Sequence, residues 1–163
     1  MNKRPPDRIG PALLPFVGFD LGELLRSVRA TRITAATLNA TVSFHRMRTL
    51  ACVEIGPSMA RIRIHEALNR EDTPRQVLEY IIGHELLHTV VRPHVERDGK
   101  VLHHPPEFRE MERRLLPEGN SVWRWLNEAL FGCIHRDTAN ESTRVKSHWP
   151  KILIGPFPAF RAS

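Results

Sequence analysis

The longest run of hydrophobic positions in the chain lies between residues 77 and 91. Apolar side chains recur there almost without interruption, at Val77, Leu78, Ile81, Ile82, Leu86, Leu87, Val90 and Val91. At about 100° per residue these positions cover nearly the whole circumference of a helix, so the pattern predicts a helix buried on most sides. Thr73 is expected to be its N-cap, with Pro74 at the first helical position and Gln76 closing a capping box. The helix should end at Arg92-Pro93, because proline disfavours helical backbone in the residue before it.

Shorter patterns upstream predict one helix and then a sheet. Asp20 and Glu23 have the spacing of an N-cap and its N3 partner, which indicates a helix to about residue 30. Apolar stretches then predict strands at residues 42–44, 51–55 and 60–64, the last two joined by a turn at residues 56–58. In the last strand Ile62 and Ile64 alternate with two arginines, so one face should be buried. We therefore expect an α+β fold, with a small, at least partly antiparallel sheet packed on the buried helix.

Turn signals downstream predict further helices and a domain boundary. Residues 93–103 are polar and contain Asp98-Gly99, which indicates a loop. A helix is expected from Pro105 to about Leu116, and another, capped by Asn120 or Ser121, up to Gly132. These patterns divide the chain into three parts, an irregular arm at 1–19, a domain at 20–132, and a tail at 133–163 that either wraps the domain or is mobile.

The buried helix contains the pattern H-E-x-x-H at residues 84–88. His84 and His88 are four residues apart, so they share one helix face and can bind one ion. Glu85 lies beside that ion, where a carboxylate can take a proton from water. Two imidazoles and a carboxylate are costly to bury without partners, and a cation would satisfy all three. The run thus predicts a metal site, and the alternative is a pair of core histidines bonded to backbone carbonyls.

A catalytic zinc usually has three protein ligands and an open position for water. His103 and His104 follow a loop long enough to reverse the chain, and Pro105 and Pro106 stiffen the entry to the next helix. His104 is expected at the N-cap of that helix. Glu107, one turn further on, is the carboxylate alternative to these histidines.

Composition narrows the classes of function. No apolar run approaches the roughly 18–20 residues of a membrane span, and the N-terminus has no signal core, so we expect a cytoplasmic protein without a membrane partner. Cys52 and Cys133 show no C-x-x-C spacing, which excludes a disulfide framework and a cysteine-built zinc ribbon. The formal charge is +6 and the positive residues are dispersed along the chain. Any DNA contact should therefore run through scattered arginines and lysines.

The two histidine motifs together resemble a known family. His84-Glu85-x-x-His88, followed after a loop by His104-Pro105-Pro106-Glu107-Phe108, resembles the SprT-like zinc metallopeptidases, which include Spartan. The resemblance covers roughly residues 38 to 116 and includes the strand at 61–64. Counted back from Phe108, it implies that His104 rather than His103 is the third ligand. It departs from the family at Pro105, where glycine is usual, and in lacking the zinc ribbon that many members use to contact nucleic acid.

The resemblance implies a zincin-like minimal metallopeptidase. Zn²⁺ would be held by His84, His88 and His104, and Glu85 would be the general base toward a protein or peptide substrate. We expect that substrate to lie along an edge strand at residues 60–64, and Tyr80 to serve in packing. The alternative function is a non-catalytic, zinc-stabilised basic protein that binds nucleic acid, and a metal-free basic module is a third reading.

Overall fold

The computed structural model describes residues 18–162, so most of the arm predicted for residues 1–19 lies outside the described part. The fold is α+β, as the sequence predicts. Its α-helices are α1 (Leu21–Thr31), α2 (Arg75–Leu87), α3 (Pro106–Leu115), α4 (Gly119–Ala129) and α5 (Trp149–Ile152). None of the helices between residues 18 and 162 is long and apolar enough to cross a membrane.

The main sheet consists of β1 (Asn39–His45), β2 (Ala51–Ile55) and β3 (Met59–His65) in the order β1-β3-β2. β3 is parallel to β1 and antiparallel to β2, which confirms a partly antiparallel sheet. The expectation that residues 60–64 form an edge is wrong, because β3 is the central strand. The turn after β2, closed by the Gly56 N–H donating to the Met59 carbonyl at 2.9 Å, places β2 beside β3, and β1 takes the other side. β1 and β2 are therefore the two edge strands, and the cleft described below borders β2.

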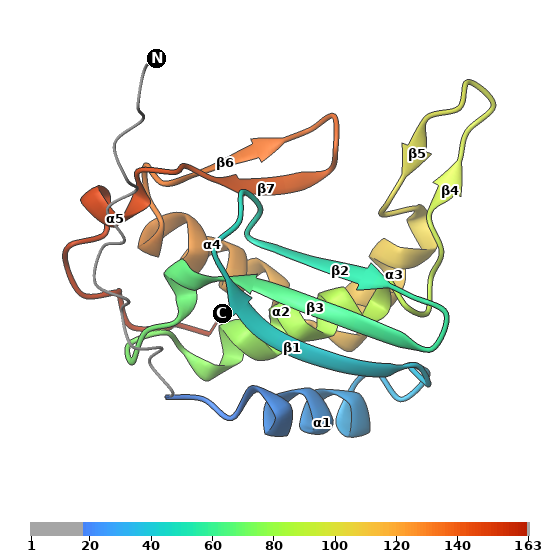
Figure 1. The fold of residues 1–163 in the computed structure, drawn as a ribbon, viewed down its shortest axis with the longest axis horizontal. Coiled ribbons are helices and arrows are strands. Elements are labelled where there is room, and N and C mark those ends of the chain that lie inside the picture. The colour runs from blue at the N-terminus through green and yellow to red at the C-terminus, as the bar shows by residue number, and fades with distance from the viewer. Residues whose placement is uncertain (1–17, 163) are drawn as a thin grey trace, which may run out of the picture.

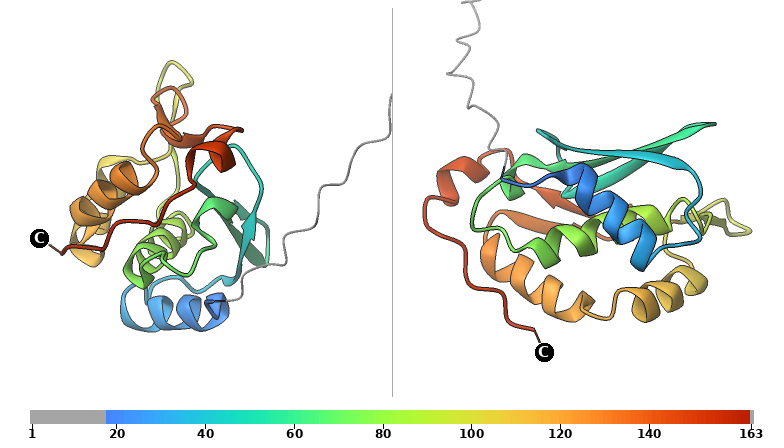
Figure 2. Two further views of the ribbon diagram at one scale, coloured as in Figure 1. Left: turned by 90° about the vertical axis from the view of Figure 1, so that its left-hand side faces the viewer. Right: turned by 90° about the horizontal axis from the view of Figure 1, so that it is seen from below.

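Helix α2 lies at the centre of the fold. Figure 2 shows the sheet and α1 on one side of it and α3 and α4 on the other. Ile62 and Ile64 of β3 are fully buried beneath it, which confirms the face predicted from their alternation. Most side chains of α2 are buried as well, including Val77, Leu78, Ile82, Leu86 and Leu87. The continuous hydrophobic run is explained by this position between two layers.

Both predicted ends of α2 need correction. Pro74 is the N-cap and no side chain caps the helix, and the Thr73 hydroxyl donates to the Leu68 carbonyl at 2.9 Å. At the other end the helix stops at Leu87, well before Pro93. The Thr89 N–H and hydroxyl both donate to the Leu86 carbonyl, at 2.9 and 2.7 Å, so the regular helical bonds give way to tighter turns. His88 is thus the C-cap of α2 rather than an interior residue.

The start of α1 agrees with the sequence, whereas the segments around α3 differ from it. The Asp20 carboxylate accepts a hydrogen bond from the Glu23 N–H at 2.8 Å, as an N-cap should. The expected loop at 93–103 is a short hairpin of β4 (His94–Val95) and β5 (Val101–Leu102), turned at Gly99 with φ of 84°. Pro105, not His104, is the N-cap of α3, and α4 begins at Gly119, before the caps expected at Asn120 or Ser121.

Residues 133–162 pack against the rest of the domain. They include the hairpin of β6 (Ile134–Asp137) and β7 (Ser142–Val145), which lies beside the start of β2 (Figure 1). The Leu50 N–H donates to the Thr143 carbonyl at 2.8 Å, and the Val145 N–H donates to the Arg48 carbonyl at 2.7 Å. Farther on, the Trp125 indole N–H donates to the Pro158 carbonyl at 2.8 Å. Of the two alternatives for this tail, the structure shows the wrapping one.

Candidate metal centre

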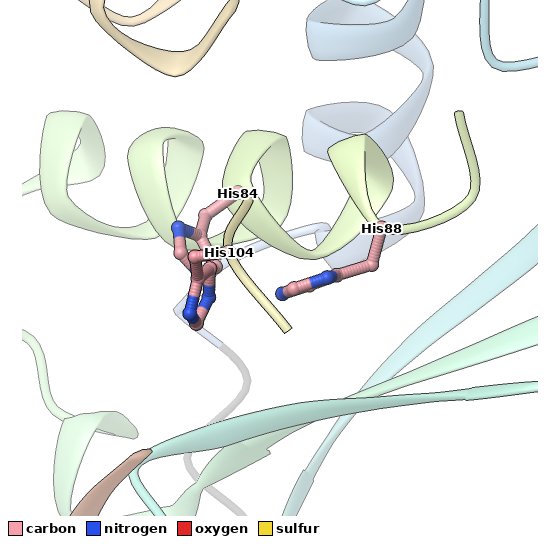
Figure 3. A group of neighbouring side chains, drawn as sticks. All are labelled: His84, His88 and His104. Atoms are coloured by element: carbon pink, nitrogen blue, oxygen red, sulfur yellow. The ribbon is translucent and has the colours of Figure 1, made fainter. Parts of the chain in front are cut away.

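Three histidines from separate positions in the chain converge on one side of α2 (Figure 3). His84 lies in the last turns of α2, His88 is its C-cap, and His104 precedes α3. One ring nitrogen from each lies within 4.8 Å of the others, and this is the group of residues between 18 and 162 that could hold a metal ion. His103 and Glu107 are both exposed and do not belong to the group. The structure therefore brings together the three histidines expected as ligands.

The separation of two of the three nitrogens fits a small tetrahedral cation. Two ligand nitrogens that are each about 2.0–2.1 Å from a tetrahedral zinc ion lie roughly 3.3 Å apart. The Nε2 atoms of His84 and His104 are 3.1 Å apart, close to that separation. An all-imidazole donor set also suits zinc better than magnesium or calcium, which prefer oxygen ligands. The donor set of this group is thus compatible with a zinc ion.

The ring of one phenylalanine contacts all three imidazoles. Phe108 in the first turn of α3 is fully buried. Its ring centroid lies 5.1, 4.5 and 4.8 Å from those of His84, His88 and His104, respectively. Contact with one rigid ring restricts the rotamers of the three histidines before any ion binds. This packing explains why a phenylalanine four residues after His104 accompanies the motif.

Glu112 is a site residue that the sequence analysis missed. Its Oε1 atom lies 2.6 Å from His84 Nδ1 and accepts a hydrogen bond from the Tyr80 hydroxyl at 2.8 Å. Holding the proton on Nδ1 leaves the Nε2 lone pair of His84 free to bind a cation. Tyr80 is buried, so it packs in the core, and its hydroxyl also holds the Glu112 carboxylate in place. A signal was available, because Glu112 is one turn after Phe108 and therefore shares its helix face.

The surroundings keep two of the imidazoles uncharged. Burial, reinforced by the neighbouring His84, lowers the pKa of His88 to about 3 and that of His104 to about 4. Burial also acts to lower the pKa of His84, but its hydrogen bond to Glu112 and the nearby Glu85 charge raise this pKa overall. His88 and His104 are thus neutral at pH 7, the form in which an imidazole binds a metal.

Glu85 is buried close to strand β2. Its side chain is buried, and burial raises the pKa of this carboxyl to about 7, despite the opposing effect of His84. The carboxylate charge also raises the pKa of Cys52 on β2, after the larger effect of that thiol's own burial, so Glu85 and β2 are close. Among the described residues Glu85 has no hydrogen-bond partner. Its oxygens are therefore available to a water or a substrate.

The three histidines and Glu85 line a cleft of about 380 Å³. Its lining includes residues of β2 and, from α4, Trp123 and Leu126. The hairpin of β6 and β7 also contributes to the lining, with Arg136, whose positive charge opposes protonation of His84. His103 lies on the lining too, apart from the ligand group. The cleft combines apolar walls with a convergent polar centre, the usual character of a small-ligand or active site.

No protein-family model, curated protein or solved structure matches this chain.

Proposed function

We propose that this protein is a zinc-dependent metallopeptidase that hydrolyses peptide bonds in protein or peptide substrates. The observation that carries the proposal is the convergence of His84, His88 and His104 beside a buried carboxylate, Glu85, with no hydrogen-bond partner among the described residues. A metal that serves only to stabilise a fold is commonly closed by four protein ligands, whereas three ligands and an open cleft suit catalysis. The resemblance of these motifs to SprT-like peptidases supports the same reaction and a zincin-like fold.

The chain's own residues account for the proton transfers. Zinc, when held by the three histidines, supplies a Lewis acid that activates water and polarises the scissile carbonyl. Glu85 accepts the proton from the attacking water and delivers it to the leaving amine. A carboxyl with a pKa near 7 is suited to both directions of transfer, although a bound cation will lower that value. Glu112 holds His84 in the tautomer that binds the ion.

The edge of β2 supplies a site for an extended substrate. Gly56 donates to Met59, and Leu50 accepts from His65, so alternate residues of β2 bond to β3. In an antiparallel pair the residues between them direct their N–H and C=O groups outward, and in β2 these are Ala51, Val53 and Ile55. All three line the cleft, and no described strand pairs with this edge of β2 beyond residue 50. A peptide can add to it as a further strand opposite the histidines.

Replacing Val53 with proline tests this binding mode. Val53→Pro removes one outward N–H and leaves the hydrogen bonds to β3 in place. Proline is tolerated at such a position, because the N–H that it lacks faces away from the sheet. We expect kcat/KM for a peptide substrate to fall roughly 2- to 12-fold, the equivalent of about 0.5–1.5 kcal/mol for one hydrogen bond. Val53→Ala keeps the N–H and serves as the control. Equal activities of the two variants, at equal thermal stability, would place the substrate elsewhere.

The proposal as a whole is tested by zinc content and cleavage together. Purified protein should contain about one equivalent of zinc and hydrolyse casein or histones, with DNA tested as an activator. A correctly folded protein that does not bind zinc would disprove the proposed metal site. Zinc binding and tight DNA binding without any hydrolysis would instead favour the non-catalytic nucleic-acid-binding function.

Some basic residues of the sheet and of α2 are paired with acidic neighbours. Arg63 forms an ion pair with Glu54 at 2.7 Å, and Arg75 forms one with Glu79 at 2.8 Å. These pairs offset part of the positive charge on the sheet and on α2. Any DNA contact is therefore proposed only through the remaining dispersed basic residues.

A further inference from the structure

The turn between β6 and β7 carries a carboxylate that reaches the backbone of the third histidine. Glu141 Oε2 accepts hydrogen bonds from the N–H groups of His103 and His104, at 2.7 and 3.2 Å. Its other oxygen accepts a hydrogen bond from Arg109 of α3 at 3.2 Å. Only 13% of the Glu141 side chain is exposed. One carboxylate thus links the hairpin, the segment before α3 and α3 itself.

The same carboxylate faces the imidazole of His104. Glu141 Oε2 lies 3.8 Å from His104 Nδ1, a buried nitrogen with no hydrogen-bond partner. A negative charge on this side favours the tautomer with the proton on Nδ1. The Nε2 atom of His104, which lies 3.1 Å from that of His84, then presents its lone pair toward the ligand group. Glu141 thus places a charge beside His104 Nδ1, whereas Glu112 is hydrogen-bonded to His84 Nδ1 at 2.6 Å.

The backbone at Glu141 is held in an unusual conformation. Its φ is 49°, in the left-handed region that residues other than glycine rarely adopt. Asp137 supports the turn by accepting hydrogen bonds from the Asn140 N–H at 3.3 Å and from the Asn140 side chain at 2.9 Å. Backbone strain of this kind persists where the surrounding structure imposes it, often at functional sites. Here it accompanies the carboxylate's bonds to the segment that carries His104.

We propose that Glu141 is a positioning residue of the metal centre, and that the functional unit therefore extends through the β6–β7 hairpin instead of ending at residue 132. The inference rests on the proposed zinc site, because it concerns how tightly His84, His88 and His104 hold that ion. Zinc binding and hairpin docking are then linked, and each stabilises the other. A chain cut at residue 132 would keep all three ligands but lose the group that orders the third.

The test compares Glu141→Ala and Glu141→Gln with Glu107→Ala in the full chain. Glu107 is an exposed carboxylate on α3, three residues from His104, and does not belong to the ligand group. Zinc affinity is measured by competition with a chromophoric chelator, and the metal-free proteins are compared by thermal unfolding. We expect Glu141→Ala to weaken zinc binding about 10- to 100-fold, the usual cost of losing an outer-shell partner. Glu141→Gln should lose less, since its amide oxygen can still accept the two N–H bonds.

The outcomes separate this inference from the proposed function. Zinc affinity of Glu141→Ala equal to that of the wild type would overturn the inference alone. Zinc affinity lost equally in Glu107→Ala would also overturn it, since charge near the site would then be the cause. If Glu141→Ala unfolds, the Glu141→Gln affinity decides. A wild type that binds zinc but cleaves nothing would end the peptidase proposal and leave the role of Glu141 intact.

Discussion

Glu85→Gln should leave zinc bound and the fold intact while lowering peptidase turnover by about 10²- to 10⁴-fold, the range that general-base catalysis supplies. The amide has nearly the same shape as the carboxylate, so the buried position beside β2 stays filled. It cannot accept a proton from water. Because burial disfavours a charged Glu85, the neutral amide should also leave the unfolding temperature unchanged or slightly raised. Turnover, zinc content and thermal unfolding are measured on one preparation.

The control for this variant is Glu107→Gln, which removes an exposed carboxylate of α3 outside the histidine group. It should retain full activity and zinc. Unchanged turnover in Glu85→Gln would remove Glu85 from the role of base. Loss of zinc from Glu85→Gln would mean that this carboxylate holds the ion or its ligands in place.

His104→Ala should weaken zinc binding far more than His103→Ala does. His104 Nε2 lies 3.1 Å from His84 Nε2 within the ligand group, whereas the adjacent His103 is exposed and outside it. Loss of a direct ligand should exceed the roughly 10- to 100-fold cost of losing an outer-shell partner. Peptidase activity at limiting zinc should fall in parallel. Chelator competition on both variants measures the difference.

The matched pair makes this result specific. Both variants remove one imidazole from neighbouring positions and leave the backbone bonds to Glu141 available, so a change common to both would reflect the loop rather than a ligand. The reverse ranking would move the third ligand to His103. Equal, small effects would mean that His84 and His88 hold the ion without a third histidine.

Local patterns in the sequence were sufficient for the secondary structure of the core. The alternation at residues 61–64 and the Asp20 cap act within a few residues, and both are found in the structure. The ends of α2 were not predictable from such rules. The Thr73 hydroxyl donates to the Leu68 carbonyl and the Thr89 hydroxyl to the Leu86 carbonyl, and which bond a threonine hydroxyl forms depends on the surrounding packing. Strand order was also beyond the sequence, because alternation defines a strand's faces but not its neighbours.

Most of the candidate metal-binding and catalytic residues could be predicted from the sequence. The spacing of His84, Glu85 and His88 on one helix follows from helix geometry alone, and the resemblance to SprT-like peptidases singled out His104. Tertiary structure alone brought His104 within reach of the other two and supplied Glu112 and Glu141, which lie 28 and 37 residues from the histidines they contact. It also made β2, instead of β3, the edge that borders the cleft. The physical reason is that ligand spacing within a helix is a local property, whereas the partners that orient ligands depend on how distant segments pack.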